Sequence, residues 1–236
     1  MELNNLIHGI YLTDVFKCEN FRETKTLHSL FVTSLLLEGE KSDYYTLQID
    51  QLKTNPKDIF KNLCNARTGL LIQAQVIRDH NGLKDNSTNL PLDKKEIGMI
   101  LKKADIEIEF ERIRRSMENS AHLPSRLTCL FLCENDPEYN GKFLIQNVLS
   151  DYSKRPYVCN VQITNKLAYH KADYRWYDKY FLDSNIQYIE NYWRGVEFKE
   201  SDEGPRWEHL LEGSIALSSE EDYENISRDG TFLNIG

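Results

Sequence analysis

PRWEHLLEG, at residues 205–213, begins with a proline and continues as a largely apolar run, in which Glu208 follows Trp207. We interpret this run as a β-strand, because a short apolar segment bounded by turn residues is typical of strands. LTCLFLC, at residues 127–133, is a second such run, and its position after Pro124 predicts a central strand. Both runs therefore predict strands, one central and one late in the chain.

Two further segments extend the predicted sheet. YVCNVQI, at residues 157–163, alternates apolar and polar positions, as half-buried strands do. LIHGIYL, at residues 6–12, predicts a strand interrupted by His8 and Gly9, where glycine allows a ligand or another backbone to approach closely. The apolar residues 70–77 also predict a strand.

Helical signals separate these strands. Asp93 followed by Glu96 predicts a capping box that opens a long helix. Apolar residues then recur at helical spacing, and most of the charged residues between them are expected to be solvated or paired within the helix. Ile186 to Trp193 predicts a later helix, and shorter helices are expected from Asn55 and around Phe143.

The alternation of strands and helices predicts an α+β fold with a mostly antiparallel or split sheet and flanking helices. A doubly wound sheet is less favoured, because no glycine fingerprint follows a strand. The chain has 236 residues, within the range of one domain. We expect a single domain over residues 1–218 and a polar C-terminal tail over residues 219–236.

Composition restricts the classes of partner and compartment. The net charge of −8 disfavours indiscriminate binding to duplex DNA, since such binding depends on neutralising phosphates. Five cysteines without paired spacing fit reduced structural thiols better than a disulfide framework or a zinc site. No secretory signal and no membrane-spanning segment is evident, so we expect a cytoplasmic protein without a membrane partner.

Without a family resemblance, the residues give little evidence for a particular catalytic activity. The sequence contains no P-loop, no HExxH helix, no GxSxG elbow and no close pair of cysteine and histidine. On pattern alone, Glu208 fits an exposed strand residue better than a catalyst.

A series of short segments carries a resemblance to a known family. Over roughly its second half the chain resembles the family of uncharacterised domains DUF2441, which looks like a branch of the ADP-ribosyltransferase superfamily. The segments that match, in order, are RR at 114–115, LPSRLTCLF at 123–131, PYVCNV at 156–161, AD at 172–173, WYD at 176–178, YWRG at 192–195 and PRWEHLLEG at 205–213.

The resemblance implies an ADP-ribosyltransferase-like split sheet that grips NAD as co-substrate in a cleft, with no metal. Glu208 would be the catalytic carboxylate, because cleavage of the bond between nicotinamide and ribose develops positive charge on the sugar. His8 with Gly9 would bind the adenosine ribose, and Ser125 with Arg126 would bind ribose and diphosphate. The alternative for His8 is a histidine at a strand end whose hydrogen bonds are made within the protein. The alternative for Ser125 and Arg126 is a turn in which Arg126 pairs with a helix carboxylate.

Other residues have weaker assignments. Trp207 would brace Glu208 or stack on nicotinamide, although plain packing explains it equally well. Asp173, Arg175 and Trp176 would form a wall for the acceptor, since basic and aromatic side chains together can bind a single nucleic-acid strand. The alternative is a loop packed by aromatic residues.

The resemblance extends to bacterial antiphage toxins of the CmdT type, which modify messenger RNA. It therefore implies a toxin that transfers ADP-ribose to RNA or another nucleic acid, with an antitoxin and a chaperone as possible partner proteins. Two alternatives remain open: an ADP-ribosyltransferase that acts on protein, and an inactive module that binds a nucleotide or a partner.

Overall fold

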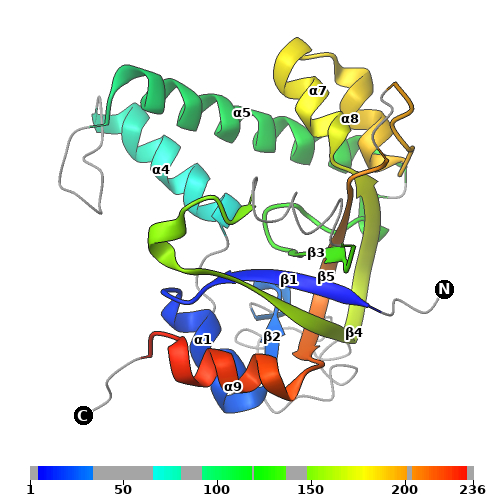
Figure 1. The fold of residues 1–236 in the computed structure, drawn as a ribbon. Helices are drawn as coiled ribbons and strands as arrows, with labels where there is room; N and C mark the ends of the chain where they lie inside the picture. Colours follow the sequence, from blue (N-terminus) through cyan, green and yellow to red (C-terminus); the bar gives the residue numbers. More distant parts are fainter. Residues whose placement is uncertain are drawn as a thin grey trace, which may run out of the picture.

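An antiparallel sheet separates two groups of helices in the computed structural model of the chain (Figure 1). The structure describes residues 5–33, 66–80, 92–118, 120–136, 148–200 and 204–232. Within these ranges the strands are β1 (Leu6–Tyr11), β2 (Thr26–His28), β3 (Leu130–Glu134), β4 (Pro156–Asp173) and β5 (Trp207–Leu217). The α-helices are α1 (Val15–Thr24), α4 (Ala66–His80), α5 (Lys94–Ser116), α7 (Arg175–Asp183), α8 (Ile186–Trp193) and α9 (Glu220–Asp229). The predicted α+β fold with an antiparallel sheet and flanking helices is confirmed.

The described strands pair in the order β2-β5-β3-β1-β4, and β4 also pairs with β5. This extra pairing closes a circuit of four strands, β5–β3–β1–β4. β4 can contribute to both pairings because it is long and contains register shifts at Ile163/Asn165 and at Lys166/Ala168, which bend a strand. The register places Glu208 between Cys133 of β3 and Ala172 of β4.

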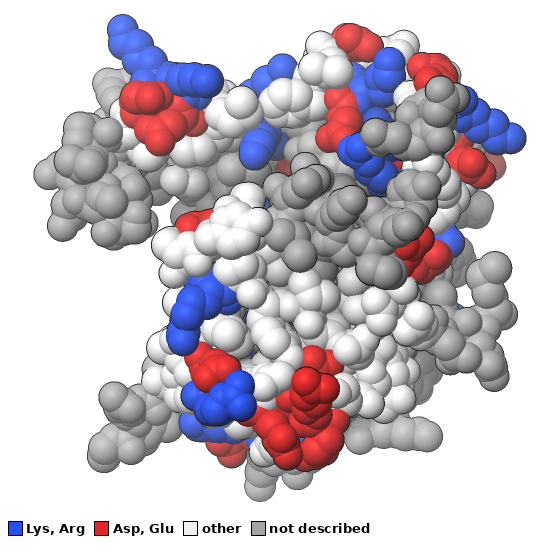
Figure 2. All heavy atoms as spheres, in the orientation of Figure 1, with Lys and Arg blue, Asp and Glu red and all other residues white. Residues whose placement is uncertain are grey.

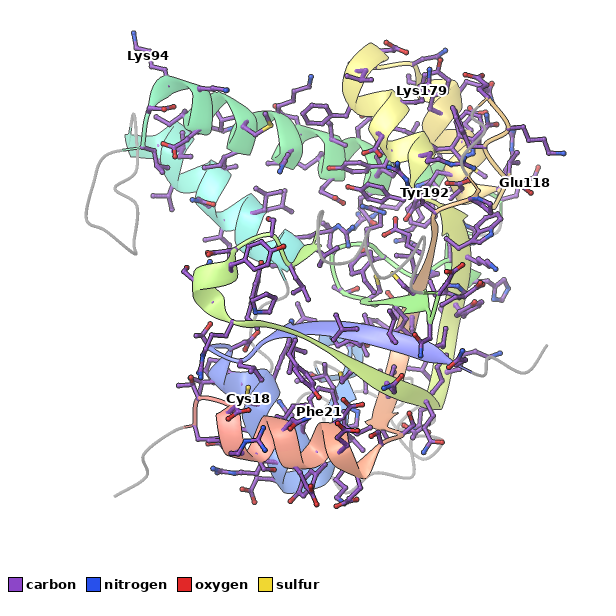
Figure 3. The ribbon with its side chains drawn as sticks, viewed as in Figure 1. Cys18, Phe21, Lys94, Glu118, Lys179 and Tyr192 are labelled. Atoms are coloured by element: carbon purple, nitrogen blue, oxygen red, sulfur yellow. The ribbon has the colours of Figure 1, made fainter. Side chains whose placement is uncertain are left out.

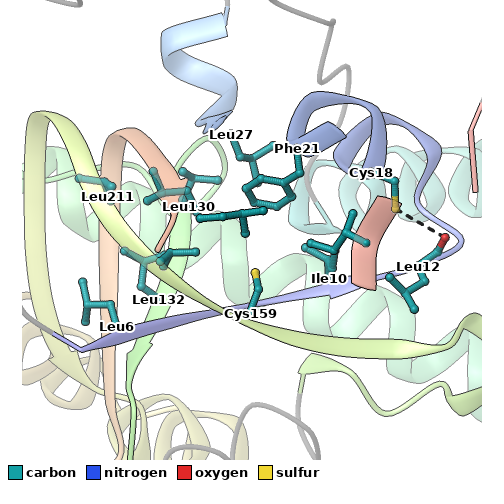
Figure 4. Close-up of a cluster of buried hydrophobic side chains, with 14 residues drawn as sticks. Leu6, Ile10, Leu12, Cys18, Phe21, Leu27, Leu130, Leu132, Cys159 and Leu211 are labelled. Carbon is teal, nitrogen blue, oxygen red and sulfur yellow. Dashed lines mark hydrogen bonds between the residues drawn. The ribbon is translucent and has the colours of Figure 1, made fainter. Parts of the chain in front are cut away.

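Each face of the sheet has its own apolar core. One core lies against α1 and α9; it contains Phe21, which Figure 4 labels, and Ile226, and both are fully buried. The second lies against α5, α7 and α8 and is rich in aromatic residues, among them Phe110, Tyr192 and Trp193. Residues that alternate along a strand therefore enter different environments.

The capping box predicted for α5 is confirmed. Oδ1 of Asp93 accepts hydrogen bonds from the backbone N–H groups of Lys95 (2.7 Å) and Glu96 (2.8 Å), and Glu96 accepts one from the backbone of Asp93. The prediction of α8 is also confirmed. The helices expected near Asn55 and Phe143 fall mainly outside the described residues.

One prediction about local structure is wrong, and one segment contains a helix that was not predicted. Residues 70–77 lie within helix α4, not in a strand; Ala74 and Ile77, three positions apart, are buried, whereas Ile72 is 57% exposed. The polar tail expected after Ser218 includes helix α9, capped by Ser219, and its Ile226 joins the core against α1. The short apolar run of α4 resembles a strand, whereas the polar residues of α9 concealed its apolar face.

None of the helices that the structure describes combines the length and apolar character needed to cross a membrane.

Gly213 in β5 provides a test of the strand packing. A Cβ atom at this position would lie 2.2 Å from the backbone oxygen of Asn165 in β4, a distance that forces the two strands apart. We expect Gly213→Ala to lower the free energy of unfolding by about 1–3 kcal/mol, measured by urea denaturation. Gly98 in α5 is the matched control, since nothing lies within 4 Å of a Cβ atom there.

Gly98→Ala is expected to raise the free energy of unfolding by about 0.5–1 kcal/mol, because alanine favours a helix more than glycine does. Equal effects of the two substitutions would contradict the close approach of β4 and β5.

Candidate functional site

Glu208 is the second residue of β5 and lies at the centre of a buried cluster of charged side chains. Its side chain is only 4% exposed. Oε1 of Glu208 accepts hydrogen bonds from Nη1 of Arg126 and from the hydroxyl of Tyr192, both at 2.5 Å. The carboxylate is thus fixed in direction by two donors from separate elements.

Arg126 links Glu208 to a second buried carboxylate. Its Nε donates to Oε2 of Glu107 at 3.0 Å and its Nη2 donates to Oε1 of Glu107 at 3.1 Å, a two-pronged contact that matches a guanidinium to a carboxylate. The Arg126 side chain is 0% exposed. The pairing of Arg126 with Glu107 of α5 corresponds to the alternative to diphosphate binding, in which Arg126 pairs with a helix carboxylate.

Arg67 of α4 forms the outer end of the cluster. Its Nε donates to Oε1 of Glu107 at 2.9 Å, and its Nη2 lies 3.6 Å from Oε2 of Glu208. Its guanidinium stacks on the ring of Phe131, 3.3 Å from the ring centroid. At 17% exposed, Arg67 is the most accessible of the four charged side chains in the cluster.

Aromatic rings surround the cluster and exclude water from it. The guanidinium carbon of Arg126 lies 5.0–5.6 Å from four ring centroids, those of Phe110, Phe131, Tyr177 and Tyr192. Attraction between opposite charges is stronger in such a surrounding than in water, so the two arginines and two glutamates offset the cost of one another's burial.

The pKa values of the cluster reflect this balance. Burial acts to raise the pKa of Glu107, but the positive charges of Arg126 and Arg67 outweigh it and hold the pKa below its usual value. Burial acts to lower the pKa of Arg126, and the charges of Glu107 and Glu208 outweigh it, so the pKa is raised. Burial raises the pKa of the Tyr192 hydroxyl. Tyr192 therefore remains a neutral donor to Glu208.

His8 does not join this cluster. Ile7, Cys133 and Glu208 are direct partners across β1, β3 and β5, so they share one face of the sheet, and His8 faces the other way. His8 is buried and its Nδ1 lies 2.8 Å from the backbone oxygen of Phe131. Burial, helped by the charge of Lys17, lowers its pKa to about 3. Gly9 is likewise buried within β1.

Trp207 also lies on the face away from Glu208, because it precedes Glu208 in the same strand. It is half-buried, and the ammonium group of Lys171 lies 4.7 Å from its ring centroid. This contact places Trp207 beside a surface lysine.

Ser125 occupies a neighbouring position with its own carboxylates. Its backbone N–H donates to Oε1 of Glu212 at 2.8 Å, and its hydroxyl donates to Glu111 at 3.0 Å. Burial raises the pKa of Glu212. Glu212 lies four residues from Glu208 along β5, about 13 Å at the usual rise of a strand. Ser125 is therefore separated from Glu208, although Arg126 reaches it.

The predicted acceptor residues lie in the interior. Asp173 and Arg175 pair at 2.6 Å and are 0% and 5% exposed. Asp173 also accepts from the backbone N–H of Phe198 (3.0 Å), and the indole of Trp176 donates to the backbone oxygen of Val196 (2.7 Å). These contacts hold the segment after α8 against α7. They correspond to the alternative to an acceptor wall, a loop packed by aromatic residues.

Sequence reasoning missed three members of the cluster. Tyr192 is buried, and its hydroxyl donates a hydrogen bond to Glu208. Glu107 was expected on a solvated helix face; its position three residues before the buried Phe110 places it on the apolar stripe of α5. Arg67 was missed because α4 was not predicted as a helix.

The comparison with protein-family models identifies one family. The model described as "Protein of unknown function (DUF2441)" matches residues 14–225, a range that includes the whole cluster around Glu208. No curated protein matches the chain.

Proposed function

The chain belongs to the DUF2441 family, and we propose that it is an NAD-dependent mono-ADP-ribosyltransferase whose catalytic carboxylate is Glu208. The observation that supports this most is that Arg126 and Tyr192 both donate hydrogen bonds to Oε1 of Glu208 within an enclosure of aromatic rings. Tyr192 is labelled in Figure 3. A carboxylate held in this way needs no reorganisation when positive charge develops beside it.

The chemistry uses the low polarity of the site. As the bond between nicotinamide and ribose breaks, positive charge develops on the sugar, and a fixed negative charge at that position stabilises the transition state more than the ground state. With Oε1 held by two donors, Oε2 of Glu208 would face the ribose. The side of the cluster toward Arg67 is the more accessible one.

The positions of the charged groups change the assignment of the residues that bind NAD. Arg126 directs all three of its nitrogens to Glu107, Glu208 and Tyr192, so we propose that it positions Glu208 rather than binding the diphosphate. Arg67 fits the diphosphate better, because it lies at the accessible end of the cluster and a guanidinium matches phosphate oxygens. His8 and Trp207 face the other side of the sheet and are left out of this site.

Nucleic acid is the acceptor that we propose, with messenger RNA favoured, in the role of an antiphage toxin with an antitoxin and a chaperone as partners. The support for this part is the resemblance of the segments between residues 114 and 213 to the DUF2441 family, whose relatives are associated with antiphage toxins of the CmdT type.

The acceptor can be identified with NAD labelled in its adenylate phosphate. The purified chain is incubated with separate pools of RNA, single-stranded DNA and protein, and the label retained by each pool is counted. We expect label in RNA that nuclease releases and protease does not. If the label were confined to protein, the acceptor would be a protein and not a nucleic acid. If no nicotinamide were released with any pool, the transferase proposal would be overturned.

A further inference from the structure

A cavity of about 760 Å³ opens between the end of α5, β4 and the end of α8. Its volume is within the range of sites for small ligands. It lies on the same face of the sheet as Glu208, since His170 on its wall is two residues from Ala172, the partner of Glu208. Tyr192 stands between the two, with its hydroxyl on Glu208 and its backbone oxygen on His170. The cavity is thus distinct from the cluster around Glu208.

The polar groups of this cavity mostly accept hydrogen bonds. Nε2 of His170 lies 2.9 Å from the backbone oxygen of Tyr192; a carbonyl oxygen only accepts, so Nε2 carries the proton and Nδ1 is an acceptor. Burial lowers the pKa of His170, which keeps its ring neutral. Glu118 and Glu190 add two carboxylates to the lining. A ligand rich in N–H donors complements this set.

The charges of the lining disfavour an anionic ligand. Glu118 and Glu190 contribute two negative charges and Arg194 contributes one positive charge, which leaves the lining with a net charge of −1. Arg194 is already paired with Glu190 at 3.2 Å. Figure 2 shows acidic and basic side chains interspersed over the α7–α8 end of the molecule, without a broad basic surface on the face in view. A phosphate group would be repelled by this lining, whereas a cation is attracted.

One wall of the cavity is aromatic: its half-buried ring is that of His170, which packs on Trp193, itself only 2% exposed. Trp193 and His170 lie with ring centroids 5.5 Å apart and planes inclined by 34°, and Met117 and Leu123 complete an apolar side. The indole N–H of Trp193 donates to the backbone oxygen of Phe110, so its ring is fixed in place. Cations, and guanidinium groups in particular, are attracted to the faces of such rings.

We propose that this cavity binds the arginine side chain of a protein or peptide partner. The guanidinium lies against the ring of His170 and donates two parallel hydrogen bonds to the carboxylate of Glu118, an exposed residue of the lining that Figure 3 labels. The inference does not depend on the proposed transfer reaction, because it concerns binding in the absence of NAD.

Three capped tripeptides test it: acetyl-Gly-Arg-Gly-amide, the same peptide with citrulline, which keeps the shape and loses the charge, and the same peptide with lysine. Binding is followed by the shift of the Trp193 indole N–H resonance and by calorimetry. We expect the arginine peptide to bind about tenfold more tightly than either of the others, and to weaken as salt is added.

Glu118→Gln is the variant that removes one acceptor at an exposed position, so it leaves the fold intact. It should weaken arginine binding at least about fivefold. Glu197→Gln, an exposed carboxylate outside the cavity, is the matched control and should bind as the wild type does. Equal affinity for arginine and citrulline, no shift of Trp193 with any peptide at about 10 mM, or tighter binding of guanosine than of the arginine peptide would each overturn the proposal.

Discussion

Replacement of Glu208 by glutamine is expected to lower the rate of nicotinamide release from NAD by about 10²-fold or more. The amide oxygen can still accept from Arg126 and Tyr192, which contact Oε1 in the wild type, so the side chain keeps its direction. What it loses is the negative charge that we propose faces the reacting ribose. Release of nicotinamide and transfer of ADP-ribose are measured together, with circular dichroism to verify folding.

Glu107→Gln is the matched control for that experiment. Glu107 pairs with the same Arg126 and is equally buried, so its replacement removes the same charge from the same cluster. It has no proposed contact with the ribose, and we expect its rate within about tenfold of the wild type. Equal losses in the two variants, or full activity of Glu208→Gln, would contradict the role of Glu208.

Replacement of Arg126 by methionine is expected to lower the free energy of unfolding by about 3–5 kcal/mol. Methionine fills much of the space but leaves Glu107 and Glu208 with one arginine, Arg67, which is 2.9 Å from Glu107 and 3.6 Å from Glu208. A buried carboxylate without its partner is costly. Denaturation in urea measures the loss.

The double variant Arg126→Met with Glu107→Gln tests the cause of that loss. It removes one buried charge of each sign and should recover part of the stability lost in Arg126→Met. A loss below about 1 kcal/mol in the single variant, or no recovery in the double variant, would contradict the charge balance of the cluster.

The strands were the most predictable part of the fold. β1, β3, β5 and the first part of β4 lie where apolar runs and alternation predict them, because buried strands leave a direct trace in the sequence. α4 and α9 escaped prediction for opposite reasons. The apolar run of α4 is short enough to imitate a strand, and the polar face of α9 conceals its buried apolar residue, Ile226.

The cluster around Glu208 shows what a single sequence leaves out. The resemblance named Glu208 and Arg126, and the structure brings these two into contact. Glu107 and Arg67 become partners only because α4 and α5 pack together, a long-range arrangement that periodicity does not contain. Alternation along β5 separates Trp207 from Glu208, and the sequence alone predicts it. The separation of His8 from Glu208 depends also on the register of β1, β3 and β5, which the structure supplies.

A crystal structure with a non-hydrolysable NAD analogue tests the central claim most directly. The account predicts the nicotinamide ribose within hydrogen-bonding distance of Oε2 of Glu208 and the diphosphate on Arg67, with Arg126 and Tyr192 still on Oε1. An analogue bound on the face of His8 and Trp207, or one that leaves Glu208 enclosed and without contact, would contradict it.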